Sequence, residues 1–228
     1  AHAEAVLIAA GIDLPAHERF TLSFVGDKVW SGYNYYLGDA ASRIEINADL
    51  PIYTERAIDL GCHEGYPGHH LQFVVQFNHP SRWRRLFAHA IFYEGWTMWC
   101  EKMAVEHRLV DLPGAELIQL HDALWRAHRI VIDCGLQDGT LTPSGAAARL
   151  RHGVGFTAAR AKADVNWYTS SPAVPMSYLL GRLEVEKLHA RLVEGRGWSL
   201  KKFNDWMLSH GALPYSWIVR AGGGGLSD

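Results

Sequence analysis

The sequence predicts a mainly α-helical protein with a small amount of β-structure near its N-terminus. Of the 228 residues, 48% are hydrophobic, which is enough apolar material for a complete core. Apolar residues recur at helical spacing through most of the chain after Pro51, whereas alternation occurs in two short runs, at residues 20–25 and 43–47. We therefore expect one helical domain over residues 1–221 with an antiparallel hairpin or short strands, and a flexible glycine-rich tail at 222–228.

The N-terminal quarter combines a helix-like stretch with the two expected strands. Residues 2–10 are rich in alanine and end at Gly11, as in a short helix. The runs at residues 20–25 and 43–47 have the length of strands and could pair with one another. Residues 33–38 between them read Tyr-Asn-Tyr-Tyr-Leu-Gly, an aromatic run that suits either ordinary packing or the wall of a substrate groove.

Capping and helix-breaking residues divide the rest of the chain into helices. Ser81 suits the N-cap of a long helix, Pro113 the first turn of another and Gly135 its C-cap, while Thr142 precedes a further helix that opens with proline. Helices are expected from Pro51 into the histidine-rich stretch and at residues 71–77, 82–109, 114–134, 143–152, 157–169, 176–193 and 198–210, the last of which is the final helix.

Composition excludes several classes of protein. The formal net charge is −2 and no basic stripe carries interleaved aromatics, so nucleic acid is not an expected partner. No apolar run approaches the ~20 residues of a membrane span. Cys62, Cys100 and Cys134 are odd in number and widely spaced, which favours reduced thiols and a cytoplasmic location. The chain begins without methionine, so we expect a fragment or processed form and leave open a lost N-terminal signal and self-association.

Residues 62–72, Cys-His-Glu-Gly-Tyr-Pro-Gly-His-His-Leu-Gln, form the most informative stretch. His63, Glu64, His69 and His70 bring three imidazoles and a carboxylate into eight positions. Neutral imidazoles bind zinc and other divalent transition metals, and a neighbouring carboxylate can act as general base. The stretch resembles the His-Glu-x-x-His helix of zinc hydrolases with an insertion, because proline stands at position 67. The alternative is a helix start with solvated histidines.

A second stretch, in the expected helix 82–109, supplies a candidate third ligand. Glu94 and Glu101 are seven residues apart and therefore lie on one helix face, among apolar residues. A carboxylate on an apolar face needs a partner, and either a metal or a structural salt bridge would provide one. With the histidines upstream, we favour Glu94 as a metal ligand. Gly95 beside it would allow another backbone to approach closely.

Two later helices carry further candidates. In the helix expected at 114–134, Arg129 and Asp133 can form an ion pair at i, i+4, and His128 is a candidate transition-state donor. In the helix expected at 176–193, Tyr178 and Arg182 lie four residues apart on one face.

Three stretches together resemble one known family. His63-Glu-Gly-Tyr-Pro-Gly-His-His-Leu-Gln, Tyr93-Glu-Gly-Trp, and Ser177-Tyr-Leu-Leu-Gly-Arg with the segment at 203–214 resemble domain-of-unknown-function family 885, over roughly residues 33–220. That family is usually grouped with gluzincin-type metallopeptidases, and its members are typically much longer. The resemblance implies a helical metallopeptidase-like fold and the C-terminal catalytic half of a zinc metallohydrolase.

The choice between His69 and His70 depends on how the chain bends at Pro67 and Gly68. Related zinc peptidases place a Gly-His pair after His-Glu, and anchoring on that pair makes His69 the second ligand. In an unbroken helix His70 would return to the face of His63, but about 10.5 Å further along the axis. A bulge at the Pro-Gly pair therefore suits His69, with His70 as the reserve.

The expected reaction is hydrolysis of a peptide or amide bond. His63, His69 and Glu94 would hold the metal, Glu64 would take a proton from the attacking water, and Tyr178, with Arg182 or His128 behind it, would stabilise the oxyanion. Relatives commonly read Asp-Thr-Gly-Leu-His where this chain has Asp133-Cys-Gly-Leu-Gln, so a pocket histidine is missing. Two alternatives are a metal-dependent lyase, isomerase or other enzyme of a small metabolite, and a non-catalytic helical binding module.

Overall fold

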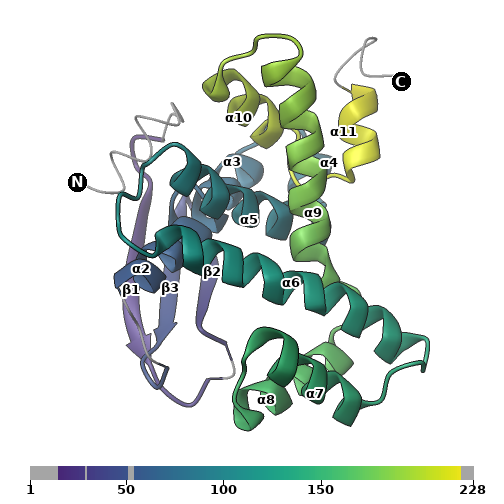
Figure 1. The fold of residues 1–228 in the computed structure, drawn as a ribbon. Coiled ribbons are helices and arrows are strands. Elements are labelled where there is room, and N and C mark those ends of the chain that lie inside the picture. Colours follow the sequence, from purple (N-terminus) through teal and green to yellow (C-terminus); the bar gives the residue numbers. More distant parts are fainter. Residues whose placement is uncertain (1–14, 29, 51–53, 222–228) are drawn as a thin grey trace.

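The computed structural model describes residues 15–28, 30–50 and 54–221 (Figure 1). The expected helix at 2–10 and the tail at 222–228 lie outside the described residues. The described chain is mainly helical with one three-stranded sheet near its N-terminus, as the sequence predicts.

The sheet consists of β1 (Arg19–Val25), β2 (Gly32–Gly38) and β3 (Ala41–Asn47). β3 lies in the centre, parallel to β1 and antiparallel to β2. The two alternating runs are therefore strands, as predicted, while the hairpin forms between β2 and β3. We did not predict β2, because tyrosines on both faces hide its alternation: Tyr33 packs on Tyr35 at 4.7 Å between ring centroids, and Tyr36 stacks on Phe77 at 4.8 Å.

Helices account for most of the remaining described chain. They are α2 (Thr54–Leu60), the π-helical turn η1 (Gly61–Gly65), α3 (His69–Phe77), α4 (Arg82–Leu86), α5 (Ala90–Glu106), α6 (Ala115–Gln137), α7 (Pro143–Val154), α8 (Ala158–Ser170), α9 (Val174–His189), the π-helical turn η2 (Ala190–Glu194), α10 (Leu200–Leu208) and α11 (Tyr215–Ala221).

Several helix boundaries follow from the capping residues that the sequence offers. The Thr142 hydroxyl accepts a hydrogen bond from the Gly145 amide (3.1 Å) and caps α7. The Thr157 hydroxyl caps α8 in the same way. Gly155 ends α7 with a φ of 82°, a conformation that glycine adopts without steric cost.

The single helix predicted at 82–109 is wrong, because the chain forms α4 and α5 with a break between them. The side chain of Gln76, on α3, donates to the backbone carbonyl oxygens of Arg84 and Phe87. These carbonyls are therefore bonded to a side chain at the break, where the sequence itself carries no helix-breaking residue.

Two other boundaries differ from the prediction. Gly135 lies inside α6 rather than at its C-cap, and a Cβ there would lie 2.8 Å from Leu141 Cβ, so this glycine makes room for the chain that returns after the helix. The helix predicted as the last is followed by α11, whose Tyr215 and Ile218 are buried. A seven-residue helix gives too few turns for a clear periodic signal.

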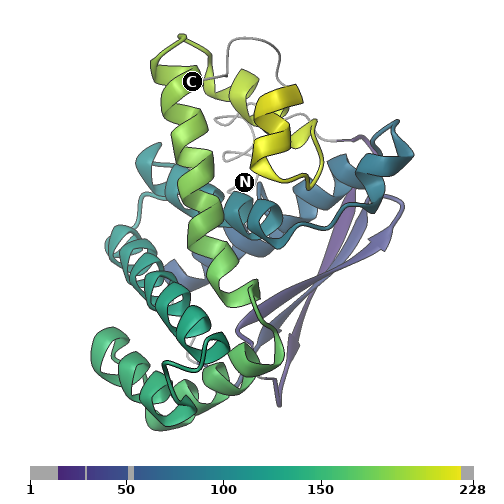
Figure 2. The same ribbon diagram turned by 90° about the vertical axis from the view of Figure 1, so that its right-hand side faces the viewer.

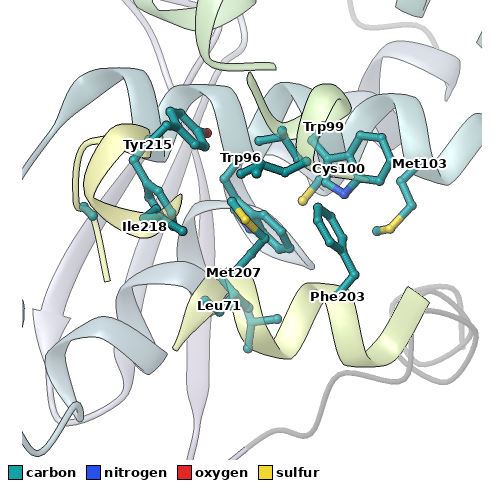
Figure 3. Packing of buried hydrophobic residues seen from close by; sticks show 14 of the residues in the cluster. Leu71, Trp96, Trp99, Cys100, Met103, Phe203, Met207, Tyr215 and Ile218 are labelled. Carbon is teal, nitrogen blue, oxygen red and sulfur yellow. The ribbon is translucent and has the colours of Figure 1, made fainter. Parts of the chain in front are cut away.

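The largest core cluster joins the C-terminal helices to α3 and α5 (Figure 3). Trp96, Trp99, Phe203 and Met207 are almost fully buried there, and Leu71 packs beneath them. A second cluster holds α6, α7 and α8 together. Figures 1 and 2 show the sheet at one side of the helical body, α10 and α11 near one end of α9, and α7 and α8 near the other.

α5 and α9 cross at two glycines. A Cβ on Gly95 would lie 2.4 Å from Gly181 Cα, and a Cβ on Gly181 would lie 1.9 Å from the Ile91 carbonyl oxygen. Both positions require glycine, and the expected close approach of a second backbone to Gly95 is confirmed. This crossing sets the positions of Glu94 and Tyr178, which these two helices carry.

Candidate metal centre

The histidine-rich stretch is a helix broken at the Pro-Gly pair. α2 continues into η1, which carries His63, and the chain then turns through a cis Tyr66-Pro67 peptide before α3 begins at His69. A Cβ at Gly68 would lie 1.9 Å from the His63 carbonyl oxygen, so only glycine allows the turn to pack this closely. The Trp96 indole N–H donates to the Pro67 carbonyl oxygen (2.8 Å) and ties the turn to α5.

This turn brings His69 next to His63 and both next to Glu94. The Nε2 atoms of the two histidines each lie 3.5 Å from Glu94 Oε2. One ligand atom from each residue lies within 4.8 Å of the others, and all three residues are buried. Two imidazole nitrogens and a carboxylate oxygen form a ligand set typical of catalytic zinc.

The polar atoms at this point fit a cation. Within the described chain, the buried Oε2 atom of Glu94 has no hydrogen-bond partner, although it faces both imidazoles. Burial alone would raise the pKa of Glu94, but the neighbouring positive charges of His69 and His63 hold it below its ordinary value. A divalent metal would satisfy this oxygen, which is otherwise costly to bury.

Glu101 orients the first histidine. His63 Nδ1 lies 2.6 Å from Glu101 Oε1, and because an ionised carboxylate can only accept, Nδ1 is the donor, while Nε2 faces Glu94. A carboxylate behind a metal-binding histidine is a common second layer of zinc sites. The sequence signal for this role was the seven-residue spacing of Glu94 and Glu101, but it gave no way to tell which histidine Glu101 would meet.

The structure directs His70 away from the other two histidines. The Ser42 hydroxyl donates to His70 Nδ1 (2.7 Å), and His70 Nε2 lies 2.7 Å from Glu18 Oε1. Both ring nitrogens are therefore bonded to the sheet side of the molecule. His70 serves as a buried connection between α3 and the strands, and it does not join the group formed by His63, His69 and Glu94.

Glu64 lies beside this group and lines a cavity of about 680 Å³. The Asn34 side-chain amide donates to the Glu64 carbonyl oxygen (2.7 Å), which fixes η1 against β2. Burial raises the pKa of the Glu64 carboxyl, while His63 and His69 lower it. A carboxylate with a raised pKa is well suited to accept and later release a proton near neutral pH.

Tyr178 also lines the cavity and stacks on His63, with 6.1 Å between ring centroids. Burial raises the pKa of its hydroxyl well above the ordinary value, so this group stays protonated and can donate. Tyr33, from the aromatic run that we interpreted as either packing or a groove wall, lines the same cavity while half exposed.

The two groups expected behind Tyr178 lie elsewhere. The His128 ring packs against Gly153, where a Cβ would lie 2.3 Å from His128 Cε1, and it does not line the cavity. Arg182 donates to Glu186 (3.0 Å) within α9 and is also absent from the lining. Instead, Arg126 and Arg129 of α6 lie next to the Tyr178 ring. The helix directs these two side chains towards Tyr178, and it directs His128 away from Tyr178.

A network of charged side chains lies next to the group formed by His63, His69 and Glu94. Asp122 pairs with Arg126 (2.6 Å) and with both terminal nitrogens of Arg56, and Arg56 also reaches Asp59 (3.3 Å). Ligand atoms of Asp59, Asp122 and Glu101 lie within 4.8 Å of one another. Because guanidinium groups or His63 pair with each of these carboxylates, this second acidic group is a charge network rather than a second metal site.

Sequence comparison shows the family of the chain. A family model described as bacterial protein of unknown function (DUF885) matches residues 34–221. The chain belongs to this family. No curated protein matches it.

Two solved structures share the fold. One, titled as the "putative lipoprotein from Colwellia psychrerythraea", has a TM-score of 0.83 and 23% identity over 96% of this chain and 40% of its own. The other, from Shewanella oneidensis, is titled a "putative lipoprotein of unknown function", with a TM-score of 0.76 and 21% identity over 97% of this chain and 43% of its own. This DUF885 chain thus spans about two fifths of the length of either neighbour.

The sequence predicts no membrane-spanning helix. None of the described helices between residues 54 and 221 is both long and apolar enough to cross a bilayer.

Proposed function

We propose that this DUF885 chain is a metal-dependent hydrolase of peptide or amide bonds, with zinc held by His63, His69 and Glu94 in a gluzincin-like site. The observation that carries the proposal is the convergence of both Nε2 atoms on the unpartnered Glu94 Oε2, at 3.5 Å each. The Glu101 carboxylate behind His63 adds the orienting group that zinc-binding histidines commonly have.

Bound zinc would supply Lewis acidity that polarises a carbonyl and acidifies a water molecule. Glu64, at the cavity wall beside the ligands, accepts the proton from the attacking water and delivers it to the leaving nitrogen. The Tyr178 hydroxyl donates to the oxygen that gains charge during the attack. The buried surroundings of Glu64 strengthen these interactions by limiting its contact with water.

Elemental analysis of the purified chain tests the proposal. We expect about one equivalent of zinc, lost with a strong chelator and regained on dialysis against zinc, with peptide or amide hydrolysis following the metal content in both directions. A chain that takes up no divalent metal, even after supplementation, would contradict the proposal and favour the binding module. A chain that holds zinc but hydrolyses no peptide or amide would favour chemistry on a small metabolite.

Replacing Glu101 by glutamine should weaken zinc binding by about ten- to a hundredfold, because His63 loses its charged acceptor. Competition with a chromophoric chelator measures this affinity. Glu106→Gln is the matched control, since Glu106 is exposed on the same helix and pairs only with Lys102 among the described residues. Equal affinities in the two variants would remove Glu101 from the site.

His70→Ala should leave the zinc content unchanged and lower the free energy of unfolding by about 1–3 kcal/mol. The substitution leaves Ser42 and the partly buried Glu18 without a hydrogen-bond partner on α3. Urea unfolding, measured on the metal-free chain, gives the stability change. Loss of zinc in a variant that remains folded would instead make His70 a ligand.

Both solved neighbours are described as lipoproteins, which also bears on location. We propose that the hydrolase works in the cell envelope, in place of the cytoplasmic location expected from the cysteines. Cys62 and Cys100 are free and buried, where a thiol acts as a small apolar group and says little about the compartment. Fractionation of cells that produce the full-length protein checks the location, and recovery in the cytosol would contradict it.

A further inference from the structure

One arginine in the cavity combines an unused hydrogen-bond donor with a guanidinium that pairs with no carboxylate among the described residues. Arg129 is 5% exposed and lines the cavity, and its Nη1 atom has no hydrogen-bond partner in the described chain. An arginine side chain carries five N–H donors in a planar fork and remains charged at any physiological pH. A buried donor left in this state is costly unless a ligand satisfies it.

The guanidinium of Arg129 is held in place from several sides. Its Nε donates to the Tyr168 hydroxyl (3.1 Å), which in turn donates to Asp164 (3.0 Å). Its Cζ lies 4.0 Å from the ring centroid of Trp125 and 5.0 Å from that of Trp167. These contacts leave the side chain little freedom, so its free donor has a fixed position, as in a preformed binding site.

The other arginines at this end of the cavity already have carboxylate partners. Arg126 and Arg56 pair with Asp122, and Arg160 lies 3.4 Å from Asp164. Among the residues that the structure describes, no carboxylate forms an ion pair with Arg129 itself. Among the described arginines at this end of the cavity, Arg129 therefore carries the positive charge that no carboxylate neutralises.

Arg129 is also next to the proposed reaction site. Its Cζ lies 4.7 Å from the ring centroid of Tyr178, and the same ring stacks on His63. A molecule that lies along this wall with one end at the metal ligands would therefore contact both Tyr178 and the Arg129 guanidinium. The indoles of Trp125 and Trp167 give this part of the wall an apolar surface.

We propose that Arg129 binds a carboxylate of the substrate, so that the chain acts on short peptides or N-acyl amino acids in which an apolar group stands next to that carboxylate. This inference rests on the proposed hydrolase function and adds its substrate class. Guanidinium and carboxylate match in a two-pronged, charge-assisted hydrogen bond, which makes the site selective for the acid over the neutral amide.

The first test measures binding to the metal-free chain, so that it does not depend on zinc or on turnover. Isothermal titration compares 3-phenylpropionate with 3-phenylpropionamide, which differ only in the charged group. We expect the acid to bind wild type about ten- to a hundredfold more tightly than the amide, the range for a hydrogen bond to a charged group.

Three variants assign the preference to Arg129. Arg129→Met should remove the preference for the acid, and Arg129→Lys, which retains the charge without the fork, should reduce it. Arg151→Met, which removes an exposed charge on α7, should leave it unchanged. Circular dichroism checks that each variant is folded, and Arg129→Lys still decides the question if Arg129→Met does not fold.

Three results would overturn the inference. They are equal binding of acid and amide by wild type, an undiminished preference in folded Arg129 variants, and loss of the preference in Arg85→Met, whose side chain lines the cavity near Phe87. Absence of zinc or of hydrolysis would instead contradict the proposed function and leave the titration result standing.

The zinc-loaded chain then distinguishes two sources of the carboxylate. N-acetyl-Gly-Phe offers a free C-terminal carboxylate, its C-terminal amide offers none, and N-acetyl-Gly-Glu amide offers only an acidic side chain. Hydrolysis of the first alone would assign Arg129 to the C-terminus, and hydrolysis of the third in preference to the second would assign it to a side chain. Equal rates on all three would contradict the inference.

Discussion

Replacing Glu64 by glutamine is expected to lower the turnover of peptide or amide substrates by about 10²- to 10⁴-fold, the range for loss of a general acid-base group. Glutamine keeps the shape of the side chain and cannot take a proton from water. Its backbone contact, the bond from Asn34 to the carbonyl oxygen, does not involve the side chain and should persist. Steady-state kinetics of the zinc-loaded variant measure the effect.

The metal content of the same preparations separates the base from the ligands. The Glu64→Gln variant should retain about one equivalent of zinc, because Glu64 lies outside the group formed by His63, His69 and Glu94. Glu94→Ala and His63→Ala should lose both zinc and activity. Activity that persisted in Glu64→Gln would show that another group is the base, and zinc lost from it would make Glu64 a ligand.

Local sequence signals were sufficient for much of the fold and for the group at its centre. Thr142 marked the start of α7, because a cap depends on residues within four positions. The Pro67-Gly68 pair required a break between His63 and His69 for the same local reason. The prediction that His63, His69 and Glu94 form one group used two local signals. One was this break, and the other was a carboxylate on an apolar helix face.

The errors arose where distant parts of the chain decide the outcome. Gln76 binds the carbonyls that interrupt the predicted helix at 82–109, and a glutamine on another helix gives no local sign of this. Arg129 and His128 are adjacent in sequence but point in different directions from α6. Arg129 lies in the cavity beside Tyr178, whereas His128 packs on Gly153, so an error of one residue in the predicted helix face selects the wrong side chain. Periodicity locates a face only to within about one residue.

The glycine crossing of α5 and α9 connects the fold to the site, and Gly181→Ala should lower the free energy of unfolding by about 3 kcal/mol. The added Cβ would lie 1.9 Å from the Ile91 carbonyl oxygen and 2.6 Å from Gly95 Cα, and backbone atoms cannot move aside as a side chain can. The helices must separate instead, which draws Tyr178 on α9 away from Glu94 on α5. Urea unfolding of the metal-free chain measures the loss.

Gly61→Ala is the matched control for this change. A Cβ at position 61 meets no atom within 4 Å, and Gly61 is not among the glycines with positive φ. Its substitution should leave stability unchanged or raise it by up to ~1 kcal/mol through the unfolded state. If Gly181→Ala were as stable as Gly61→Ala, the two helices would not be in backbone contact. The proposed roles of Glu94 and Tyr178 in one reaction would then lose their structural basis, since this crossing is what holds the two side chains at one cavity.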